Sequence, residues 1–82
     1  MMKVRILYFS TFKDLTGVNK EEIPLPGEIV IADLQAYLAK LHPSIERGLP
    51  TAVFTINKDF AFPDEVIKDG DEVAIFPPIS GG

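Results

Sequence analysis

The last six residues, Pro77 to Gly82, are the part of the chain whose residue types and spacing could do chemistry. Pro77 and Pro78 cannot donate a sheet hydrogen bond, so they end the preceding strand and stiffen the direction in which the chain leaves it. The remaining residues are Ile79, a candidate anchor, and the thin Ser80, Gly81 and Gly82. Six extended residues reach at most about 20 Å. A flexible tail of this kind is able to enter a narrow tunnel in another protein and present the Gly82 carboxylate there, since glycine has no Cβ to obstruct a tight site.

The rest of the chain contains no catalytic constellation. His42 is the one histidine and precedes a proline at a predicted helix end, where a structural or carbonyl-capping role is expected. Ser80 has no base partner in the sequence. Cysteine is absent, which excludes a disulfide framework, a thiolate metal site and a cysteine nucleophile. We therefore expect no active site within the domain, no metal and no stably bound cofactor.

Composition limits the partners. The chain has 82 residues, enough for one domain, and 8 basic against 12 acidic residues give a net charge of −4. That charge disfavours non-specific binding to nucleic acid and suits a protein partner with a basic surface. No apolar run approaches the roughly 18 residues of a membrane span, and the N-terminus lacks a signal-peptide pattern. We expect a protein of the cytoplasm that binds neither nucleic acid nor membrane.

Periodicity predicts the elements that must position the tail. Strands are predicted at 2–9, 21–26, 51–57, 60–62 and 71–76, a short helical turn at 10–17 and the main helix at 31–41. In the first strand Val4, Ile6 and Tyr8 alternate with Lys3, Arg5 and Leu7. The main helix carries an apolar stripe formed by Ile31, Leu34, Leu38 and Leu41.

Turn and cap residues mark the ends of these elements. Thr11 with Asp14 resembles a capping box, and Gly17 supplies a helix stop. Phe12 and Leu15 are expected to share the packed face of this turn. Pro24 marks the second strand as an edge strand. The segment 43–50 is predicted to be a loop.

A single helix must bury its stripe against one face of a sheet. The order of elements predicts an α+β domain of the β-grasp, or ubiquitin-like, class, with a mixed sheet of four to five strands packed on one main helix. The first and last strands are expected to be parallel central neighbours. Residues 1–76 form this domain, and residues 77–82 form the tail. A split ferredoxin-like fold is the alternative, but it needs a second long helix that the sequence lacks.

The strand phases also predict an apolar patch on the outer face of the sheet. Leu7 and Phe9 should point away from the helix, as should Ala74 and Phe76 in the last strand. Exposed apolar patches of this kind mark interaction sites. The alternative is that the loop before Pro50, or the turn at 10–17, folds over the patch.

Acidic residues form a run near the C-terminus. They are Asp64, Glu65, Asp69, Asp71 and Glu72. The simpler interpretation is a solvated face, with Gly70 providing a turn; the alternative is electrostatic steering toward a basic partner.

Three segments resemble the small subunit of molybdopterin synthase, the MoaD-type sulfur carriers. They are "KVRILYFSTFKDLTG" from Lys3, "IADLQAYLAKLHP" from Ile31 and "DGDEVAIFPPISGG" from Asp69. The ending is the specific part. Val30 stands where such sequences often place a helix-capping Ser or Thr, so the helix is expected to start weakly or to start at Asp33.

The resemblance implies a reaction cycle at the C-terminus. A ubiquitin-activating-like adenylyltransferase consumes ATP to adenylate Gly82, and sulfur then replaces AMP to give a thiocarboxylate. The tail inserts into the large subunit of molybdopterin synthase, in a heterotetramer, and the sulfur attacks cyclic pyranopterin monophosphate. The docking residues carry over to Phe9, Phe76, Pro77 and Pro78, and the reactive end to Gly81 and Gly82.

Other carriers share a terminal Gly-Gly, so alternatives stay open. A ubiquitin-like modifier would join the same adenylated terminus to lysines, and archaeal small modifiers resemble this sequence almost as well. Sulfur carriers of other pathways, for thiamine or for tRNA thiolation, would use the same end. In an interaction domain the two glycines would be incidental.

Overall fold

The computed structural model describes residues 2–78. The predictions for Ile79, Ser80, Gly81 and Gly82 lie outside these residues. The elements are β1 (Met2–Tyr8), α1 (Thr11–Thr16), β2 (Lys20–Leu25), β3 (Ile29–Val30), α2 (Ile31–Leu41), the 3-10 turns η1 (Pro43–Ile45) and η2 (Leu49–Thr51), β4 (Val53–Ile56), β5 (Asp59–Ala61), β6 (Val66–Ile67) and β7 (Glu72–Phe76).

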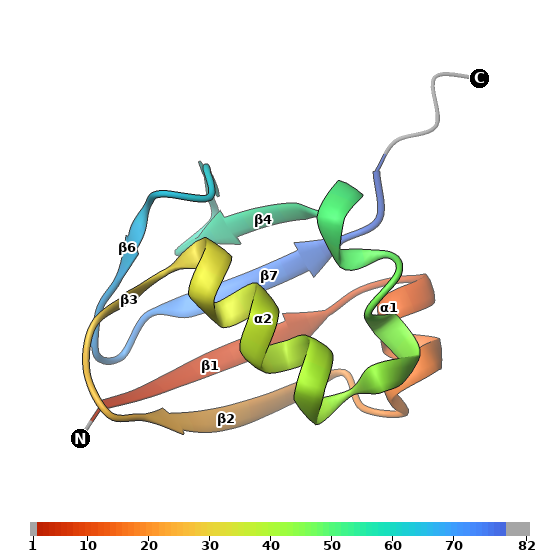
Figure 1. The fold of residues 1–82 in the computed structure, drawn as a ribbon, viewed down its shortest axis with the longest axis horizontal. Helices are drawn as coiled ribbons and strands as arrows, with labels where there is room; N and C mark the ends of the chain where they lie inside the picture. Colours follow the sequence, from red (N-terminus) through yellow and green to blue (C-terminus); the bar gives the residue numbers. More distant parts are fainter. Residues whose placement is uncertain (1, 79–82) are drawn as a thin grey trace.

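The main sheet has five strands in the order β2-β1-β7-β4-β5, and α2 lies across one of its faces (Figure 1). β1 and β7 are parallel central neighbours, while the pairs β1–β2, β4–β7 and β4–β5 are antiparallel. The strand that contains Pro24 lies at an edge, where a missing N–H donor is tolerated. The predicted β-grasp fold with a mixed sheet on one main helix is confirmed.

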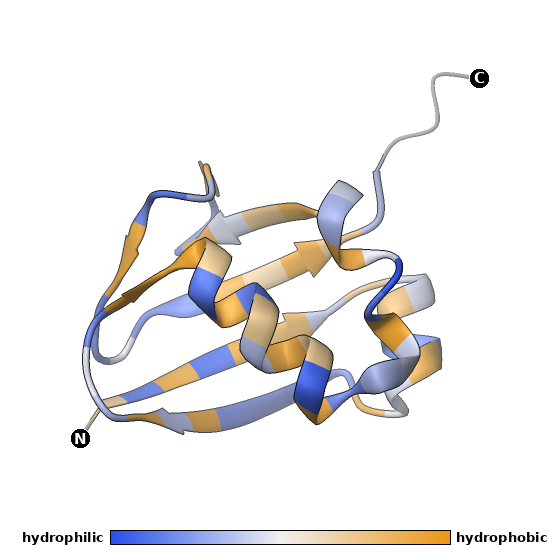
Figure 2. Ribbon diagram, viewed as in Figure 1, coloured by the Kyte–Doolittle hydropathy of each residue, from blue (hydrophilic) through white to orange (hydrophobic). Residues whose placement is uncertain are grey.

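The core lies between the sheet and α2. Figure 2 shows hydrophobic and hydrophilic residues alternating along β1, and Val4, Ile6 and Tyr8 are each buried on the helix side. From α2, Ile31, Leu34 and Leu38 join the same core cluster. Leu41, the last residue of α2, does not: it is 44% exposed. The stripe predicted on α2 is thus correct for its first three members.

The N-terminus of α2 is capped by backbone and not by a side chain. The N–H groups of Ile31 and Ala32 donate to the carbonyl oxygens of Glu65 and Pro63, each at 3.0 Å. These bonds satisfy two of the donors that every helix start leaves unpaired. The helix therefore begins at Ile31, directly after Val30, and the predicted shift to Asp33 is wrong.

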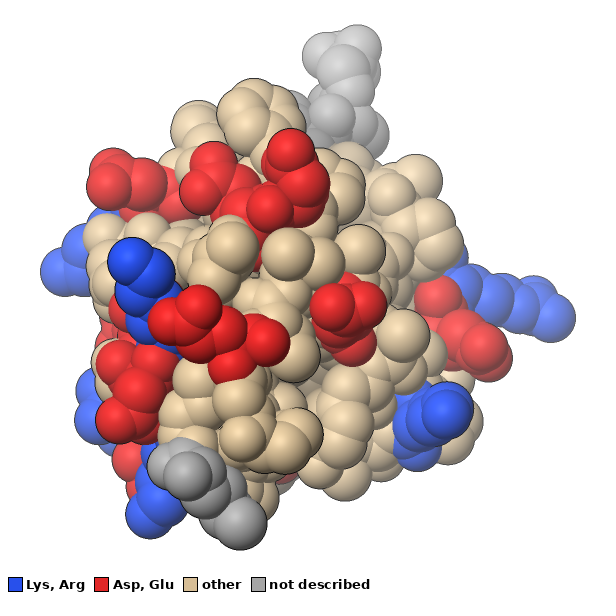
Figure 3. Space-filling view, turned by 60° about the vertical axis from the view of Figure 1, so that its left-hand side comes forward, with Lys and Arg blue, Asp and Glu red and all other residues tan. Residues whose placement is uncertain are grey.

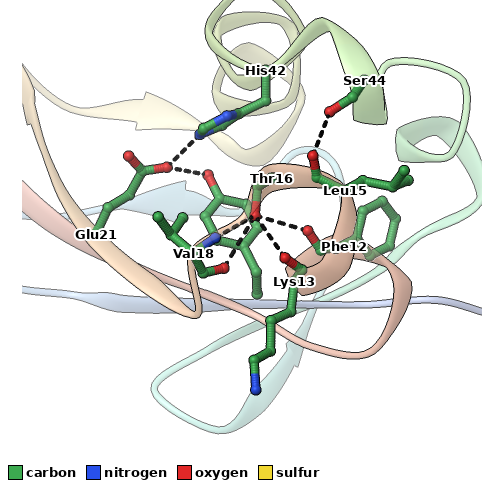
Figure 4. Close-up of polar contacts among 9 residues, drawn as sticks. Phe12, Lys13, Leu15, Thr16, Val18, Glu21, His42 and Ser44 are labelled. Carbon is green, nitrogen blue, oxygen red and sulfur yellow. Dashed lines mark hydrogen bonds and ion pairs between the residues drawn. The ribbon is translucent and has the colours of Figure 1, made fainter.

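The short helix α1 also starts differently from the prediction. Ser10 precedes it with φ 55° and ψ −127°, no side chain caps it, and Thr11 is its first helical residue, so the capping box is wrong. The predicted pairing of Phe12 with Leu15 fails as well, since Leu15 is 54% exposed. The predicted stop is correct: Gly17 has φ 79° and its N–H donates to the carbonyl of Lys13. The Thr16 hydroxyl donates to the carbonyl of Phe12 at 2.8 Å and closes the last turn (Figure 4).

Segments predicted as loop contribute to the core and to a second sheet. The 43–50 segment forms most of the two 3-10 turns, which bury Ile45 and Leu49 in the core cluster. The Ser44 hydroxyl donates to the carbonyl of Leu15 and joins this segment to α1 (Figure 4). β3 and β6 form a separate two-stranded antiparallel sheet that the sequence did not predict. Within residues 2–78, no helix has the length and apolar character needed to cross a membrane.

Candidate docking surface at the end of the last strand

Two aromatic rings stack where β1 and β7 end. The parallel pairing sets Leu7 beside Ala74, and one step further the Phe9 N–H donates to the Ile75 carbonyl at 3.2 Å. This register brings the rings of Phe9 and Phe76 together, with centroids 4.5 Å apart and planes at 10°. Phe9 is 39% exposed, and Phe76 lies outside the core cluster. The structure therefore places both predicted phenylalanines together on the outer face.

The stack forms one wall of an open apolar groove of about 500 Å³, called the docking groove below. The residues that line it are Phe9, Ser10, Val53, Thr55, Phe60, Phe76 and Pro77. Phe60 is 78% exposed, a large fraction for a phenylalanine. The sequence analysis did not select Phe60, Val53 or Thr55. β4 and β5 form a tight hairpin through Asn57 and Lys58, and a strand of three residues is too short for its pattern to show which residues face the groove. Pro77, the first residue of the predicted tail, borders the same groove.

Leu7 and Ala74 contribute less than predicted. Ala74 is on the outer face but only 6% exposed, so its prediction as exposed docking surface is wrong. Its register partners are Leu7 on one side and Thr55 on the other, and both side chains are larger than its methyl group. Leu7 is half-buried, and it is not among the residues that line the groove.

The docking groove is open, and no segment of residues 2–78 covers it. The segment before Pro50 packs into the core through Ile45 and Leu49. The turn that follows β1 contributes Ser10 to the groove wall but leaves Phe9 exposed. The alternative that one of these segments folds over the patch is therefore excluded.

Ser10 holds an unusual backbone conformation at the edge of this groove. Its φ of 55° lies in a region that favours glycine. Two hydrogen bonds fix the corner: Phe12 N–H donates to the Phe9 carbonyl, and Asp14 N–H to the Ser10 carbonyl, each at 3.1 Å. Strain of this kind persists where surrounding bonds over-determine it, and it is common at functional sites.

On the opposite face, behind Phe9, three polar side chains meet; they are called the clasp below. Glu21 Oε2 accepts a hydrogen bond from the Tyr8 hydroxyl at 2.6 Å. The same oxygen lies 2.7 Å from His42 Nε2 (Figure 4). The rings of Tyr8 and His42 meet edge to face with centroids 5.5 Å apart. Burial raises the pKa of the Tyr8 hydroxyl far above its usual range, and the bond to Glu21 and its charge raise it further. His42 thus has a structural role, as predicted, but through a carboxylate and not through helix carbonyls.

The acidic run lies at the other end of β7. Asp69 Oδ1 accepts the Lys3 N–H at 2.8 Å, and Asp71 accepts the Lys68 N–H at 2.8 Å and the Asn57 amide at 2.9 Å. Gly70, with φ 84°, makes the predicted turn between the two aspartates. Figure 3 shows acidic side chains gathered over this end of the molecule. Steering by these charges stays a prediction, and two of the five acidic residues have a structural function.

Within residues 2–78, no group of three His, Cys, Asp or Glu side chains is arranged to hold a metal ion. The described part of the chain offers an apolar docking groove but no cluster of groups suited to acid–base or nucleophilic chemistry at that groove. What the geometry can do is bind another protein beside the point where the chain leaves the sheet.

Comparison with known proteins agrees with this geometry. Residues 6–82 match the ThiS family. The chain belongs to the ThiS family. A molybdopterin synthase sulfur carrier subunit of Chlamydomonas reinhardtii is 39% identical over 83 residues, which cover 99% of this chain and 100% of the relative. The human protein of the same description is 33% identical, and the match covers 100% of this chain and 97% of the human protein.

Solved structures of other proteins show the same fold. A putative molybdopterin converting factor subunit 1 from Pyrococcus furiosus has a TM-score of 0.86 at 32% identity, with 96% of this chain and 100% of that chain covered. The modifier SAMP1 of Haloferax volcanii has a TM-score of 0.84 at 25% identity, and the match covers 98% of this chain and 99% of SAMP1. The β-grasp fold and the family are thereby established for this chain.

Proposed function

We propose that this chain is a sulfur carrier in molybdenum cofactor biosynthesis, the small subunit of a molybdopterin synthase. The observation that carries the proposal is the position of the docking groove, whose wall includes Pro77, the root of the tail. The four residues beyond Pro78 span at most about 14 Å. A partner that acts on the Gly82 carboxylate must therefore lie close to the groove. The names of the Chlamydomonas and human relatives support the same role.

The reactive group in this proposal is the C-terminus itself. The Gly82 carboxylate attacks the α-phosphorus of ATP and pyrophosphate leaves, giving an acyl-adenylate. A sulfur nucleophile then attacks the acyl carbon and AMP leaves, giving a thiocarboxylate. That sulfur attacks cyclic pyranopterin monophosphate, forming a C–S bond as a C–O bond of the substrate breaks. Water then cleaves the acyl–sulfur bond, so that the sulfur stays on the product and Gly82 returns as a carboxylate. The chain itself holds no cofactor in this scheme, and ATP is consumed by the activating partner.

Two partners follow from this scheme. One is a ubiquitin-activating-like adenylyltransferase, and the other is the large subunit of molybdopterin synthase, in a heterotetramer. A complex of subunits 1 and 2 of the Helicobacter pylori molybdopterin-converting factor contains a chain of this fold, with a TM-score of 0.68 at 20% identity. Phe9, Phe76 and Phe60 are the proposed anchors, because buried aromatic side chains dominate binding energy at protein interfaces. Pro77 to Gly81 form the inserted tail.

The experiment is the intact mass of the protein purified from its native cell. A gain of about 16 Da, the replacement of one oxygen by sulfur at a carboxylate that becomes a sulfur nucleophile, supports the proposal. A mass that never departs from the unmodified value in cells making the cofactor would contradict it.

The second candidate is a ubiquitin-like modifier. The likeness to SAMP1 of Haloferax volcanii favours it. The same adenylated Gly82 would then form an amide with lysines of other proteins. Protein-sized adducts in the same mass experiment would support this candidate over the first. A sulfur carrier for thiamine synthesis or for tRNA thiolation would show the same 16 Da gain. Loss of the molybdenum cofactor in a strain that lacks this protein would distinguish the proposed pathway from these two.

A further inference from the structure

The clasp joins three elements at one carboxylate oxygen. Glu21 is in β2, Tyr8 is the last residue of β1, and His42 follows the last residue of α2. The Glu21 and His42 side chains are 26% and 18% exposed, and Tyr8 is 1% exposed. Hydrogen bonds in such a partly dehydrated place are stronger than in water. The clasp therefore restrains the end of β1 from its inner face.

The donors and acceptors of the clasp are determined by its chemistry. A carboxylate only accepts hydrogen bonds, so with Glu21 in that form Nε2 of His42, 2.7 Å away, carries the hydrogen between them. The Tyr8 hydroxyl donates to the same oxygen. Its raised pKa keeps this hydroxyl protonated, so the donor persists throughout the neutral and mildly alkaline range.

The restrained residue is the immediate neighbour of a docking anchor. Tyr8 and Phe9 are consecutive, with Tyr8 pointing into the core and Phe9 stacked on Phe76 on the outer face. The Tyr8 N–H donates to the Asn19 carbonyl at 2.9 Å, so its backbone is restrained as well. Directly after Phe9 the chain turns through the strained Ser10. Movement of Tyr8 would therefore be transmitted to the Phe9 ring through one peptide unit.

We propose that Tyr8, Glu21 and His42 position Phe9 for docking, a role that rests on the proposed function. The three are positioning residues: they lie on the opposite face of the sheet from the partner and act through the Phe9–Phe76 stack. Loss of the clasp leaves the anchors present but less well held, so the partner must order them on binding.

The test measures the affinity of the full-length protein for its own large synthase subunit, well below the melting temperature. Tyr8→Phe removes one hydroxyl and keeps the ring. We expect about three- to fivefold weaker binding, in line with one lost hydrogen bond. Tyr37→Phe is the matched control, since Tyr37 is 41% exposed on α2, and we expect no change from it. Glu21→Ala, which removes the oxygen that Tyr8 and His42 share, should also weaken binding.

Two further measurements identify the route of the effect. In a Phe9→Ala background, Tyr8→Phe should cause no additional loss, because the residue it positions is gone. The NMR resonances of the Phe9 and Phe76 rings should shift in Tyr8→Phe and not in Tyr37→Phe. The proposal that the clasp positions Phe9 would be overturned if Tyr8→Phe weakened binding equally with and without the Phe9 side chain. It would also be overturned if the Phe9 and Phe76 ring resonances did not shift in Tyr8→Phe. If Phe9→Ala alone leaves the affinity unchanged, the proposed docking fails, and the ring resonances still decide whether the clasp positions Phe9.

Discussion

The two ends of β7 carry different kinds of side chain, held in different ways. At its start, near Glu72, charged groups have structural partners: Asp71 bonds Lys68 and Asn57, and Glu72 lies 3.4 Å from Arg5. At its end, Phe76 stacks on Phe9, beside the exposed Phe60. An exposed ion pair of this kind contributes little to stability. Exposed phenylalanines around an open groove have no role in the core.

This comparison bears on two predictions that the sequence made for β7. The acidic residues near its start were predicted either to face solvent or to steer a partner, but two of them build the turn before the strand. Phe76, at the other end, faces outward beside a groove, as the strand phase predicted. The difference predicts that substitutions at the start of β7 act on folding and that substitutions at its end act on partner binding.

Phe76→Ala should have the largest effect and should act on binding more than on folding. Hot-spot aromatics typically cost about 2 kcal/mol or more on truncation, so we expect at least roughly 30-fold weaker binding to the large synthase subunit. Phe62→Ala is the matched control, because Phe62 is 68% exposed but does not line the groove. Calorimetry of binding and of unfolding measures the two effects. A variant that melts early and binds normally would place Phe76 in the core.

Asp71→Ala tests the other end of β7 and should act on folding. It removes the acceptors of the Lys68 N–H and the Asn57 amide, so we expect a loss of about 1 to 2 kcal/mol in the free energy of unfolding. The affinity for the large synthase subunit should be unchanged. Asp64→Ala is the control, since the Asp64 carboxylate forms no hydrogen bond with other residues of the described range 2–78. Equal stability of the two variants in urea unfolding would show that the turn does not depend on Asp71.

The Tyr8 hydroxyl should have a smaller effect on the free energy of unfolding, and this effect should depend on pH. Its pKa is raised in the folded state, so its contribution to stability is complete below the unfolded pKa of about 10 and is lost as pH rises from there toward the folded value. At pH 10.5 this loss is about 0.8 kcal/mol. The difference in stability between the wild type and Tyr8→Phe should shrink by that amount between pH 9 and 10.5. A difference independent of pH over this range would mean that the Tyr8 hydroxyl ionises normally in the fold.

Much of the fold could be predicted because its main signals are local. Alternation in β1 and the helical spacing of Ile31, Leu34 and Leu38 are each visible within one segment. The parts that were missed depend on distant residues. The cap of α2 comes from the carbonyls of Pro63 and Glu65, more than 30 positions away, and no side-chain pattern encodes it. β3 and β6 have two residues each, too few for a period to appear.

The candidate site was predicted in the same uneven way. Phe9 and Phe76 followed from the phase of two long strands that the fold places side by side. Phe60 was missed because its position depends on the pairing of β4 with the three-residue β5. The prediction that Ala74 is exposed was wrong. The alternation of a strand shows on which face a side chain lies but not how exposed it is, and the exposure of Ala74 depends on the size of its neighbours Leu7 and Thr55. The clasp joins Tyr8, Glu21 and His42, residues that no motif connects.

The most direct measurement is ATP–pyrophosphate exchange with the activating enzyme, on the wild type, on a Gly82 deletion and on a variant with one residue added after Gly82. The core cluster lies within residues 2–75, so both variants should melt as the wild type does. A one-residue change moves the carboxylate by about 3.3 Å along an extended chain, while reaction needs the atoms within roughly 3–3.5 Å. We predict that exchange and thiocarboxylate formation are lost in both variants. Full activity in the Gly82 deletion would contradict the carrier function and the modifier alternative together.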